Sequence, residues 1–375
     1  MAEDLRFHNG KFTIMQIADA QEIPTVNPDT IKLISRALDK VKPDLVVFTG
    51  DQLKGYSPLF KGNTYRKISR TIADLLRPLE ERSIPFCVTF GNHDCNCGIA
   101  NAKQMPIYRS HKGFIGGKVR EETDPGTFSL VIRDSSGKKD RFALYVIDSG
   151  GKGEDSAYAP VTSERVQWFR TERDRLQSEN NGYLPALVFQ HIPLPEYYDA
   201  LVRVEKGTKG AVEAFYGHSG EYYILPDEAT ARGDFMHESP AAPDESTGEL
   251  DALLEKGDVL GIYVGHDHIN SFSLQHRGIT LGYTQGCGFH TYGPGSKRGV
   301  RIFTLDENDL STFETRTVTM EDLCDYKPAK PLTEFIYTHT PSSPRQVLKY
   351  LPHGLIATGA ATALSIGAAL VKKKK

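Results

Sequence analysis

The stretch LVVFTGDQ, residues 45–52, joins a short apolar run to a polar turn. Residues 45–49 have the length and composition of a fully buried strand, and Gly50 and Asp51 follow directly. Buried strands of this kind are typical of sheets covered by helices, where functional groups lie in the loops that follow the strands. The stretch therefore predicts an α/β fold with Asp51 at a candidate site.

The residues on either side of this stretch alternate between strand and helix patterns. Residues 12–18 are typical of a strand, and residues 31–41 carry apolar side chains at helical spacing and end before Pro43. A second amphipathic helix is expected at residues 68–79 and a third strand at residues 85–90. Such alternation indicates an α/β sheet wrapped by helices.

The second half of the chain adds strands to this plan. A helix is expected at residues 166–176. The strand patterns predict a hairpin (128–132 with 142–147), two buried strands that each end in a histidine-bearing loop (187–189 and 261–264), and a second sheet packed on the first (279–283 and 300–305).

We expect one domain over residues 1–325. Within it, residues 203–248 are rich in Gly, Pro, Glu and His, and they predict an inserted loop region over the site. Prolines and a weakening pattern indicate a linker over residues 326–353.

The end of the chain predicts contact with a membrane. Residues 354–371 carry no charge and precede a lysine cap at residues 372–375, but Gly, Ala, Thr and Ser dominate the segment. A membrane-attached helix and a peripheral Ala-rich helix both stay open. The first twelve residues include acidic side chains and no apolar run, so they do not form a secretory signal. We expect a cytoplasmic body, with the tail as its membrane attachment.

Composition excludes several classes of protein. With 39% hydrophobic and 25% charged residues, the chain can bury a large core. A formal net charge of -3 without a long basic block predicts no nucleic-acid surface, which favours a small substrate. Five scattered cysteines indicate a reducing compartment, and Cys95 and Cys97 lack the second pair that a zinc cage needs.

Five polar clusters share one position, the loop directly after a predicted buried strand. Any one of them is weak evidence, because Gly-Asp turns and single histidines are common. Together and in this order they predict a common rim of oxygen and imidazole groups. The clusters are Asp19-Ala20-Gln21, Gly50-Asp51-Gln52, Gly91-Asn92-His93-Asp94, Gln190-His191 and Gly265-His266-Asp267-His268.

This set resembles the calcineurin-like metallophosphoesterase superfamily, whose pattern is D-x-H, G-D, G-N-H-D/E, H and G-H-x-H. The resemblance covers residues 11–305, and the wider spellings at residues 49–52, 90–94 and 190–193 are similar to a purple-acid-phosphatase-like branch of fungi, plants and bacteria. It implies a sandwich of two β-sheets flanked by helices, with four αββα layers and a metal site at the carboxyl ends of the strands.

The resemblance also implies two divalent cations, with Mn favoured over Fe, Zn or Mg. One is expected at Asp19, Asp51 and His268, and the second at Asp51, Asn92, His191 and His266, with Asp51 bridging. A carboxylate can span two cations, and amide oxygen and neutral imidazole complete their shells without excess charge.

The implied activity is hydrolysis of a phosphomonoester or phosphodiester by a hydroxide that bridges the two metals. In this scheme His93 protonates the leaving group as general acid, and Asp94 orients and charges His93. The substrate is expected to be a small phosphorylated compound or a phosphoprotein.

Two positions depart from the family pattern. Gln21 stands where the D-x-H histidine is expected, and an amide oxygen is a weaker ligand than imidazole. Tyr56 lies five residues after Asp51, not at the three-residue spacing of the tyrosinate ligand of purple acid phosphatases, so a ferric tyrosinate centre is not expected. Because of Gln21, a catalytically weak or inactive scaffold protein stays open as an alternative function.

Several aromatic and histidine residues are candidates for substrate contact, with hydrogen-bonded loop residues as the alternative interpretation. The candidates are Tyr197, His218, His237 and His290, with Tyr198, Glu238 and Tyr292 beside them.

Overall fold

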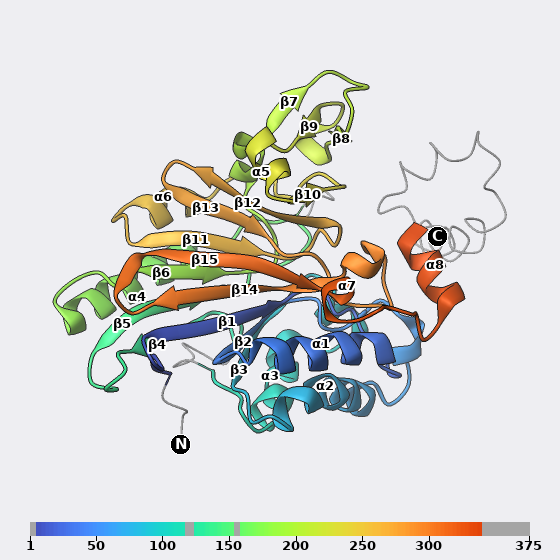
Figure 1. The fold of residues 1–375 in the computed structure, drawn as a ribbon, viewed down its shortest axis with the longest axis horizontal. Helices are drawn as coiled ribbons and strands as arrows, with labels where there is room; N and C mark the ends of the chain where they lie inside the picture. Colours follow the sequence, from blue (N-terminus) through green and yellow to red (C-terminus); the bar gives the residue numbers. More distant parts are fainter. Residues whose placement is uncertain (1–4, 117–123, 154–157, 340–375) are drawn as a thin grey trace.

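The computed structural model describes residues 5–116, 124–153 and 158–339, and every structural statement concerns these residues. Two large sheets pack against each other with helices on both outer sides (Figure 1). The first sheet has the order β15–β14–β1–β2–β3, with bounds Asp309–Thr319, Gly299–Asp306, Lys11–Ile17, Leu45–Thr49 and Phe86–Thr89.

The second sheet contains seven strands. Its order is β10–β12–β13–β11–β6–β5–β4, with bounds Phe235–Met236, Asn270–His276, Ile279–Tyr283, Val259–Val264, Ala186–Phe189, Asp140–Val146 and Phe128–Arg133. β1, β2 and β3 run parallel, as do β5, β6, β11 and β13, so each sheet has a parallel centre. The expected hairpin is present as the antiparallel pair β4 and β5.

Helices α1, α2 and α3 pack on the outer face of the first sheet, and α4 and α6 pack on that of the second. The α-helices are α1 Pro28–Val41, α2 Thr64–Glu80, α3 Asn101–Arg109, α4 Ser163–Asn180, α5 Asp227–Ala231, α6 Glu249–Leu254, α7 Met320–Leu323 and α8 Pro331–His339. Short 3-10 turns are η1 Pro58–Phe60, η2 Asp94–Cys97, η3 Pro195–Ala200, η4 Tyr216–His218 and η5 Gly295–Lys297.

Local sequence explains where α1 begins and ends. The Asn27 side chain accepts a hydrogen bond from the Asp29 amide, and Pro28 occupies the first turn, where no amide donor is needed. Lys42 closes the helix in the left-handed conformation, directly before Pro43.

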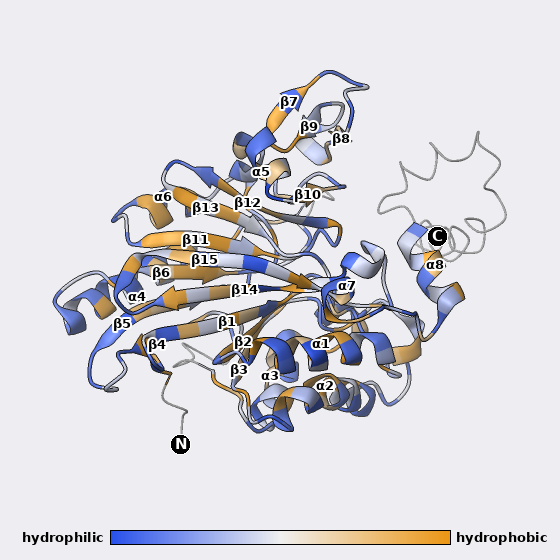
Figure 2. Ribbon diagram, viewed as in Figure 1, coloured by the Kyte–Doolittle hydropathy of each residue, from blue (hydrophilic) through white to orange (hydrophobic). Residues whose placement is uncertain are grey.

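Three hydrophobic clusters fill the spaces between the four layers. Alternate residues of a strand point to opposite faces, so Ile14 of β1 packs between the sheets while Met15 and Ile17 pack with α1 and α2. Figure 2 shows β6 and β11 as largely hydrophobic, in contrast to the edge strand β15. These layers confirm the predicted four-layer αββα architecture.

One strand was assigned to the wrong sheet. The pattern predicts residues 300–305 in a second sheet with residues 279–283, but β14 pairs antiparallel with β1 in the first sheet. Only β13 joins the second sheet. An apolar run shows that a strand is buried and does not show which neighbour it pairs with.

Two regions have more structure than their composition predicts. The insertion at 203–248 was expected as loops, but it carries a three-stranded sheet, β7–β9–β8, with bounds Val202–Val204, Tyr222–Ile224 and Val212–Glu213. Within the predicted linker, residues 331–339 form α8, and Glu334 lies 3.6 Å from Nε of the fully buried Arg298. This burial of a charge pair fixes α8 to the domain.

The predicted tail at 354–371 and its lysine cap lie outside the described residues. In the ranges that the structure describes, no helix has the length and apolar character needed to cross a bilayer.

Candidate metal centre

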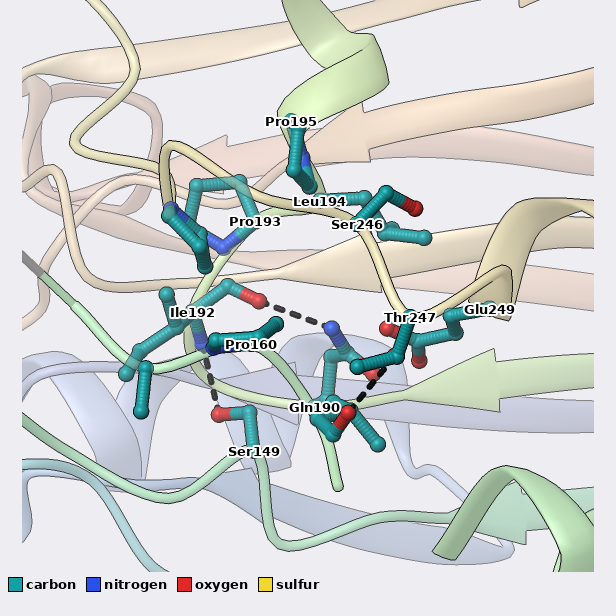
Figure 3. A pocket seen from close by; sticks show the side chains of 13 residues that line it. Ser149, Pro160, Gln190, Ile192, Pro193, Leu194, Pro195, Ser246, Thr247 and Glu249 are labelled. Carbon is teal, nitrogen blue, oxygen red and sulfur yellow. Dashed lines mark hydrogen bonds between the residues drawn. The ribbon is translucent and has the colours of Figure 1, made fainter. Parts of the chain in front are cut away.

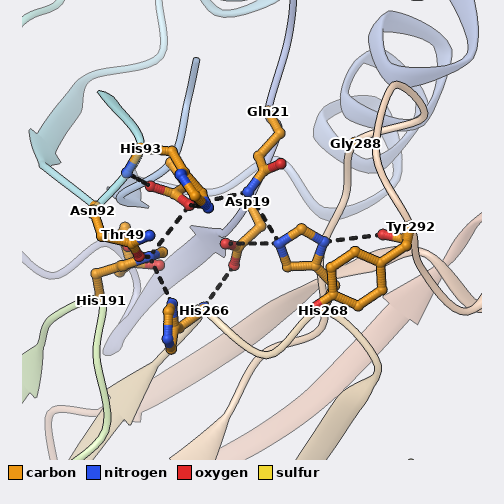
Figure 4. Close-up of polar contacts among 12 residues, drawn as sticks. Asp19, Gln21, Thr49, Asn92, His93, His191, His266, His268, Gly288 and Tyr292 are labelled. Atoms are coloured by element: carbon orange, nitrogen blue, oxygen red, sulfur yellow. Dashed lines mark hydrogen bonds and ion pairs between the residues drawn. The ribbon is translucent and has the colours of Figure 1, made fainter. Parts of the chain in front are cut away.

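The five predicted clusters meet at one edge of the sandwich, at the carboxyl ends of β1, β2, β3, β6 and β11 (Figure 4). Asp19, Gln21, Asp51 and His266 all adopt positive φ, between 37° and 76°. Such conformations cost non-glycine residues of order 1–3 kcal/mol each and collect at functional sites. Backbone hydrogen bonds hold the strained loops together, including one of 2.8 Å from the Gln21 amide to the Asp51 carbonyl.

One half of the centre is formed by Asp51, Asn92, His191 and His266. Nε2 of His191 lies 3.5 Å from Oδ2 of Asp51, 3.1 Å from Oδ1 of Asn92 and 3.3 Å from Nδ1 of His266. Nδ1 of His191 lies 2.9 Å from the Thr49 carbonyl, which can only accept a hydrogen bond. In neutral His191 the proton therefore sits on Nδ1, and the Nε2 lone pair faces the cluster.

The other half is formed by Asp19 and His268, with Asp51 between the halves. Oδ1 of Asp19 lies 3.4 Å from Nε2 of His268, while its Oδ2 accepts a 2.8 Å hydrogen bond from the His266 amide. Nδ1 of His268 is 2.9 Å from the Tyr292 carbonyl, so its Nε2 is turned toward the cluster. Asp19, Asp51 and His191 offer ligand atoms that all lie within 4.8 Å of one another.

The donor set fits divalent cations. Asp19, Asp51 and His191 are almost fully buried, and Oδ1 of Asp19 and Nε2 of His266 have no hydrogen-bond partner among the described residues. Burying such groups without a partner is costly, and carboxylate, amide oxygen and imidazole are ligands that suit Mn, Fe, Zn or Mg. The six residues are therefore able to hold metal, and their assignment as ligands stays a prediction.

Charges within the cluster shift its titration. Burial alone would lower the pKa of His191, but the facing carboxylates of Asp51 and Asp19 raise it to about 10. The pKa of His266 is lowered well below its usual range by burial and by the neighbouring His191. Without cations, one proton on His191 therefore balances part of the carboxylate charge.

Cation affinity should rise with pH for this reason. A cation must displace the His191 proton, and proton competition weakens as pH rises toward a pKa of about 10. For each proton released, apparent Mn²⁺ affinity should gain up to about tenfold per pH unit between roughly pH 6 and pH 8. Calorimetric titrations in buffers of different ionisation enthalpy measure the Mn²⁺ affinity and the number of protons released. An affinity independent of pH would contradict a protonated His191 in the metal-free protein.

His93 lies at the open side of the centre. Its side chain is 28% exposed, and Nε2 lies 4.0 Å from Oδ2 of Asp51. Its backbone amide donates a 2.8 Å hydrogen bond to Oδ1 of Asp51, which fixes the ring beside the metal ligands. This position suits a group that meets a substrate oxygen.

The contacts of Asp94 differ from those that its predicted role requires. Its Oδ2 accepts hydrogen bonds from the amides of Asp51 and Gly91, both 2.8 Å, and its Oδ1 accepts one of 2.9 Å from Leu53. Asp94 therefore ties two loops together. The His93 ring is held instead by Asn96, whose Oδ1 lies 3.3 Å from Nδ1 of His93.

The structure places two of the predicted substrate contacts in the interior of the protein. Tyr197 is fully buried, and its hydroxyl donates to the carbonyls of Ile262 and Gly282. His290 is buried with Nδ1 2.8 Å from Oε2 of Glu22. Both side chains satisfy interior hydrogen bonds.

The other two candidates belong to the insertion. The ring of His218 stacks on that of Tyr198, with 4.0 Å between the ring centroids. The ring of His237 stacks on that of Phe235, with 5.3 Å between the centroids. His237 is exposed. Their contact with substrate stays a prediction.

Aromatic side chains border the centre, and sequence reasoning missed two of them, Tyr158 and Tyr216. The Tyr158 ring lies edge-on to the His266 ring, with 4.4 Å between the ring centroids. The ring of Tyr216, in the insertion, lies edge-on to that of Tyr158, with 5.8 Å between the centroids. The Tyr292 ring stacks on the His268 ring, with 4.2 Å between the ring centroids, and the centroids of the Tyr56 and His93 rings are 4.7 Å apart. Their position in Gly-rich loops is the feature of the sequence that could have indicated these tyrosines. No motif places them at a fixed spacing from the predicted ligands.

Gly288 shows how tightly the loops pack at the centre (Figure 4). A Cβ at this position would lie 1.9 Å from the Ala20 carbonyl oxygen and 2.9 Å from that of Asp19. Replacing Gly288 by alanine should lower the free energy of unfolding by about 1–3 kcal/mol and weaken Mn²⁺ binding, because the backbone of Asp19 must move.

Thermal unfolding and Mn²⁺ titration check this expectation. The matched control is Gly182→Ala, because no atom lies within 4 Å of its added Cβ and its φ is not positive. Equal effects of the two variants would contradict the role given to Gly288.

A small cavity lies behind the His191 loop (Figure 3). It measures about 10 Å³, room for about one water molecule. Beside it, the Gln190 side chain donates to the Ile192 carbonyl and Ser149 accepts from the Ile192 amide, so the turn that carries His191 is fixed. The cavity is too small for a substrate, and the hydrogen bonds beside it hold the loop that carries His191.

Known proteins resemble this chain along most of its length. The model of the family described as "Calcineurin-like phosphoesterase" matches residues 12–270. The protein named "Probable inactive purple acid phosphatase 29" from Arabidopsis thaliana is 26% identical over 347 residues, covering 81% of this chain and 79% of that protein. "Phosphatase DCR2" of Saccharomyces cerevisiae is 24% identical over 351 residues, covering 85% and 56%.

Among solved structures, a dimetal phosphatase from Danio rerio is similar in fold. The TM-score is 0.50 at 13% identity, covering 82% of this chain and 98% of that chain. At this identity the likeness concerns the fold alone. It agrees with the two-sheet sandwich described above.

Proposed function

Since the chain belongs to the calcineurin-like phosphoesterase family, we propose that it is a metal-dependent phosphoric ester hydrolase acting at the centre described above. The observation that carries the proposal is the convergence of six ligand side chains with His93 at their open side. The ligands are Asp19, Asp51, Asn92, His191, His266 and His268.

Two divalent cations held there, with Mn²⁺ as the favoured ion, would lower the pKa of a water and neutralise phosphoryl charge. The protein's own part is to fix the ligands and to supply a proton. The backbone carbonyl of Thr49 holds His191, and that of Tyr292 holds His268. Each histidine ring is thereby oriented with its Nε2 toward the centre. His93, fixed through its amide to Asp51, would give the leaving-group oxygen its proton from Nε2.

The proposed substrate is a small phosphorylated compound or a phosphoprotein. The same ligand set suits monoesters and diesters, since both place phosphoryl oxygens against the cations and a leaving oxygen at His93. The Tyr56 and Tyr158 rings, which flank His93 and His266, would border the leaving group.

The test compares 4-nitrophenyl phosphate and bis(4-nitrophenyl) phosphate as substrates of the purified, Mn²⁺-loaded protein. Nitrophenol release above that of an Asp51→Asn blank is expected for at least one ester. Removal of metal by a chelator should abolish this release, and added Mn²⁺ should restore it.

A scaffold protein is the second candidate, and Gln21 is the observation that favours it. Three of the curated relatives that match this chain carry the word "inactive" in their names. Against this, the chain keeps the other ligands and also His93, which a binding site alone would not need. A fully Mn²⁺-loaded protein that releases no more nitrophenol than the blank, with either ester, would favour the scaffold.

A further inference from the structure

The side chain of Gln21 lies between two groups that the family pattern assigns to one cation. Its Nε2 is 3.0 Å from Oδ2 of Asp51 and 3.2 Å from Nε2 of His268. Both distances are those of hydrogen bonds. Figure 4 shows the amide above Asp19, next to His268.

Hydrogen-bond chemistry fixes which end of the amide faces the centre. The Asp51 carboxylate can only accept, so the Gln21 atom beside it must be the NH₂ group. Nδ1 of His268 faces the Tyr292 carbonyl, and its Nε2 faces the same NH₂ group of Gln21, 3.2 Å away. The NH₂ group therefore lies against two atoms that the family pattern assigns to one cation.

The far end of the amide is held as well. Oε1 of Gln21 accepts a 3.3 Å hydrogen bond from the hydroxyl of Tyr56, whose ring rests against His93. The Tyr56 hydroxyl keeps its proton at neutral pH, because a phenol ordinarily has a pKa of about 10. Tyr56 thus tethers the amide over the centre.

We propose that Gln21, tethered by Tyr56, is a stopper that closes the Asp19–His268 half of the centre to a cation. An NH₂ group cannot donate electrons to a metal, and here it saturates the atoms of Asp51 and His268 that would bind one. Among the described residues, no other amide NH₂ group faces the ligand atoms of Asn92, His191 and His266 in the second half. The protein therefore takes up one divalent cation tightly and a second one only when Gln21 gives way.

This inference rests on the metal centre of the proposed function, but it is tested by counting bound metal and does not require turnover. Mn²⁺ is titrated into the metal-free full chain, and bound ions are measured by elemental analysis and by electron paramagnetic resonance, which separates single from spin-coupled Mn²⁺. The wild type should bind one ion tightly and a second at least about tenfold more weakly. Two ions bound with equal affinity would overturn the proposal.

Gln21→Ala separates a stopper from a ligand. A stopper predicts that the second ion binds at least about tenfold more tightly than in wild type, because the hydrogen bonds to Asp51 and His268 no longer have to break. A ligand predicts weaker binding of that ion. Unchanged or weaker binding would overturn the proposal. Gln21→His, which restores the family ligand, should give two tightly bound ions and a coupled spectrum.

Tyr56→Phe tests the tether without touching Gln21. Loss of the hydroxyl should also strengthen binding of the second ion. Tyr65→Phe is the matched control, because Tyr65 has the same 50% exposure as Tyr56 and lies on α2. If Tyr56→Phe binds the second ion with the same affinity as this control, or more weakly, Tyr56 does not hold Gln21 in the closing position.

A protein without esterase activity that shows these changes in ion number would refute the proposed function and leave this inference standing. An active protein that binds two ions with equal affinity would refute this inference and leave the proposed function standing.

Discussion

Replacing Asp51 by asparagine should remove most bound Mn²⁺ and all measurable ester hydrolysis. Oδ2 of Asp51 lies between His191 and Gln21, and its Oδ1 accepts the His93 amide proton. The buried carboxylate is thus the group that both halves of the centre share. Asparagine keeps the shape but loses the charge, and one of its two ends becomes a donor.

The size of this effect follows from the burial of Asp51, which is 1% exposed. Removing one partner of a buried charge pair typically costs about 3–5 kcal/mol, which corresponds to roughly 10²- to 10⁴-fold in cation affinity. Elemental analysis of the purified variant and the nitrophenyl ester assay measure the two losses.

Asp258→Asn is the control, because Asp258 is also buried but precedes β11, at the end of that strand away from His266. It should keep metal and activity. An Asp51→Asn protein with wild-type metal content and wild-type rate would show that the centre is not where the reaction occurs.

Replacing His93 by alanine should reduce the rate by about 10²- to 10⁴-fold while metal content stays at the wild-type value. The His93 ring is near the ligands but leans toward solvent, and its Nε2 is 4.0 Å from Asp51. Its ring is therefore placed to act on the substrate. Elemental analysis and kcat together separate this role from metal binding, and His8→Ala, at an exposed position outside the centre, is the control.

The pH profile gives a second readout of the same substitution. Burial lowers the pKa of His93, and the charge of Asp51 opposes this only in part. A general acid must hold its proton, so the rate should fall as pH rises through a value below about 6.5. The alanine variant should lose this falling limb. Metal loss in proportion to activity, or an unchanged profile, would contradict the role of general acid.

The sequence predicted the site better than it predicted the sheets around it. Asp51 follows β2 directly and His191 follows β6, so each ligand is carried by the strand before it, and local patterns suffice to place it. The structure brings all six predicted ligands to one edge for this reason. Strand order, by contrast, depends on pairing between distant segments, and β14 was therefore assigned to the wrong sheet.

Roles that depend on the direction of a side chain were the least predictable. Asp94 is adjacent to His93 in the chain, yet it turns inward to three backbone amides while Asn96 reaches the His93 ring. Tyr158 and Tyr216 reach the centre from separate loops that no spacing rule connects. Gln21 was recognised as a departure, but only its contacts show that its NH₂ group faces the ligands.

The most direct test of a metal-dependent hydrolase is to restore Mn²⁺ stepwise to the metal-free protein and to measure bound metal and nitrophenol release in the same samples. We predict no release without metal, and a rate that rises with bound Mn²⁺ and is highest when both cations are bound. A rate that stays the same after metal is stripped, or a fully loaded protein without turnover, would contradict the proposed function.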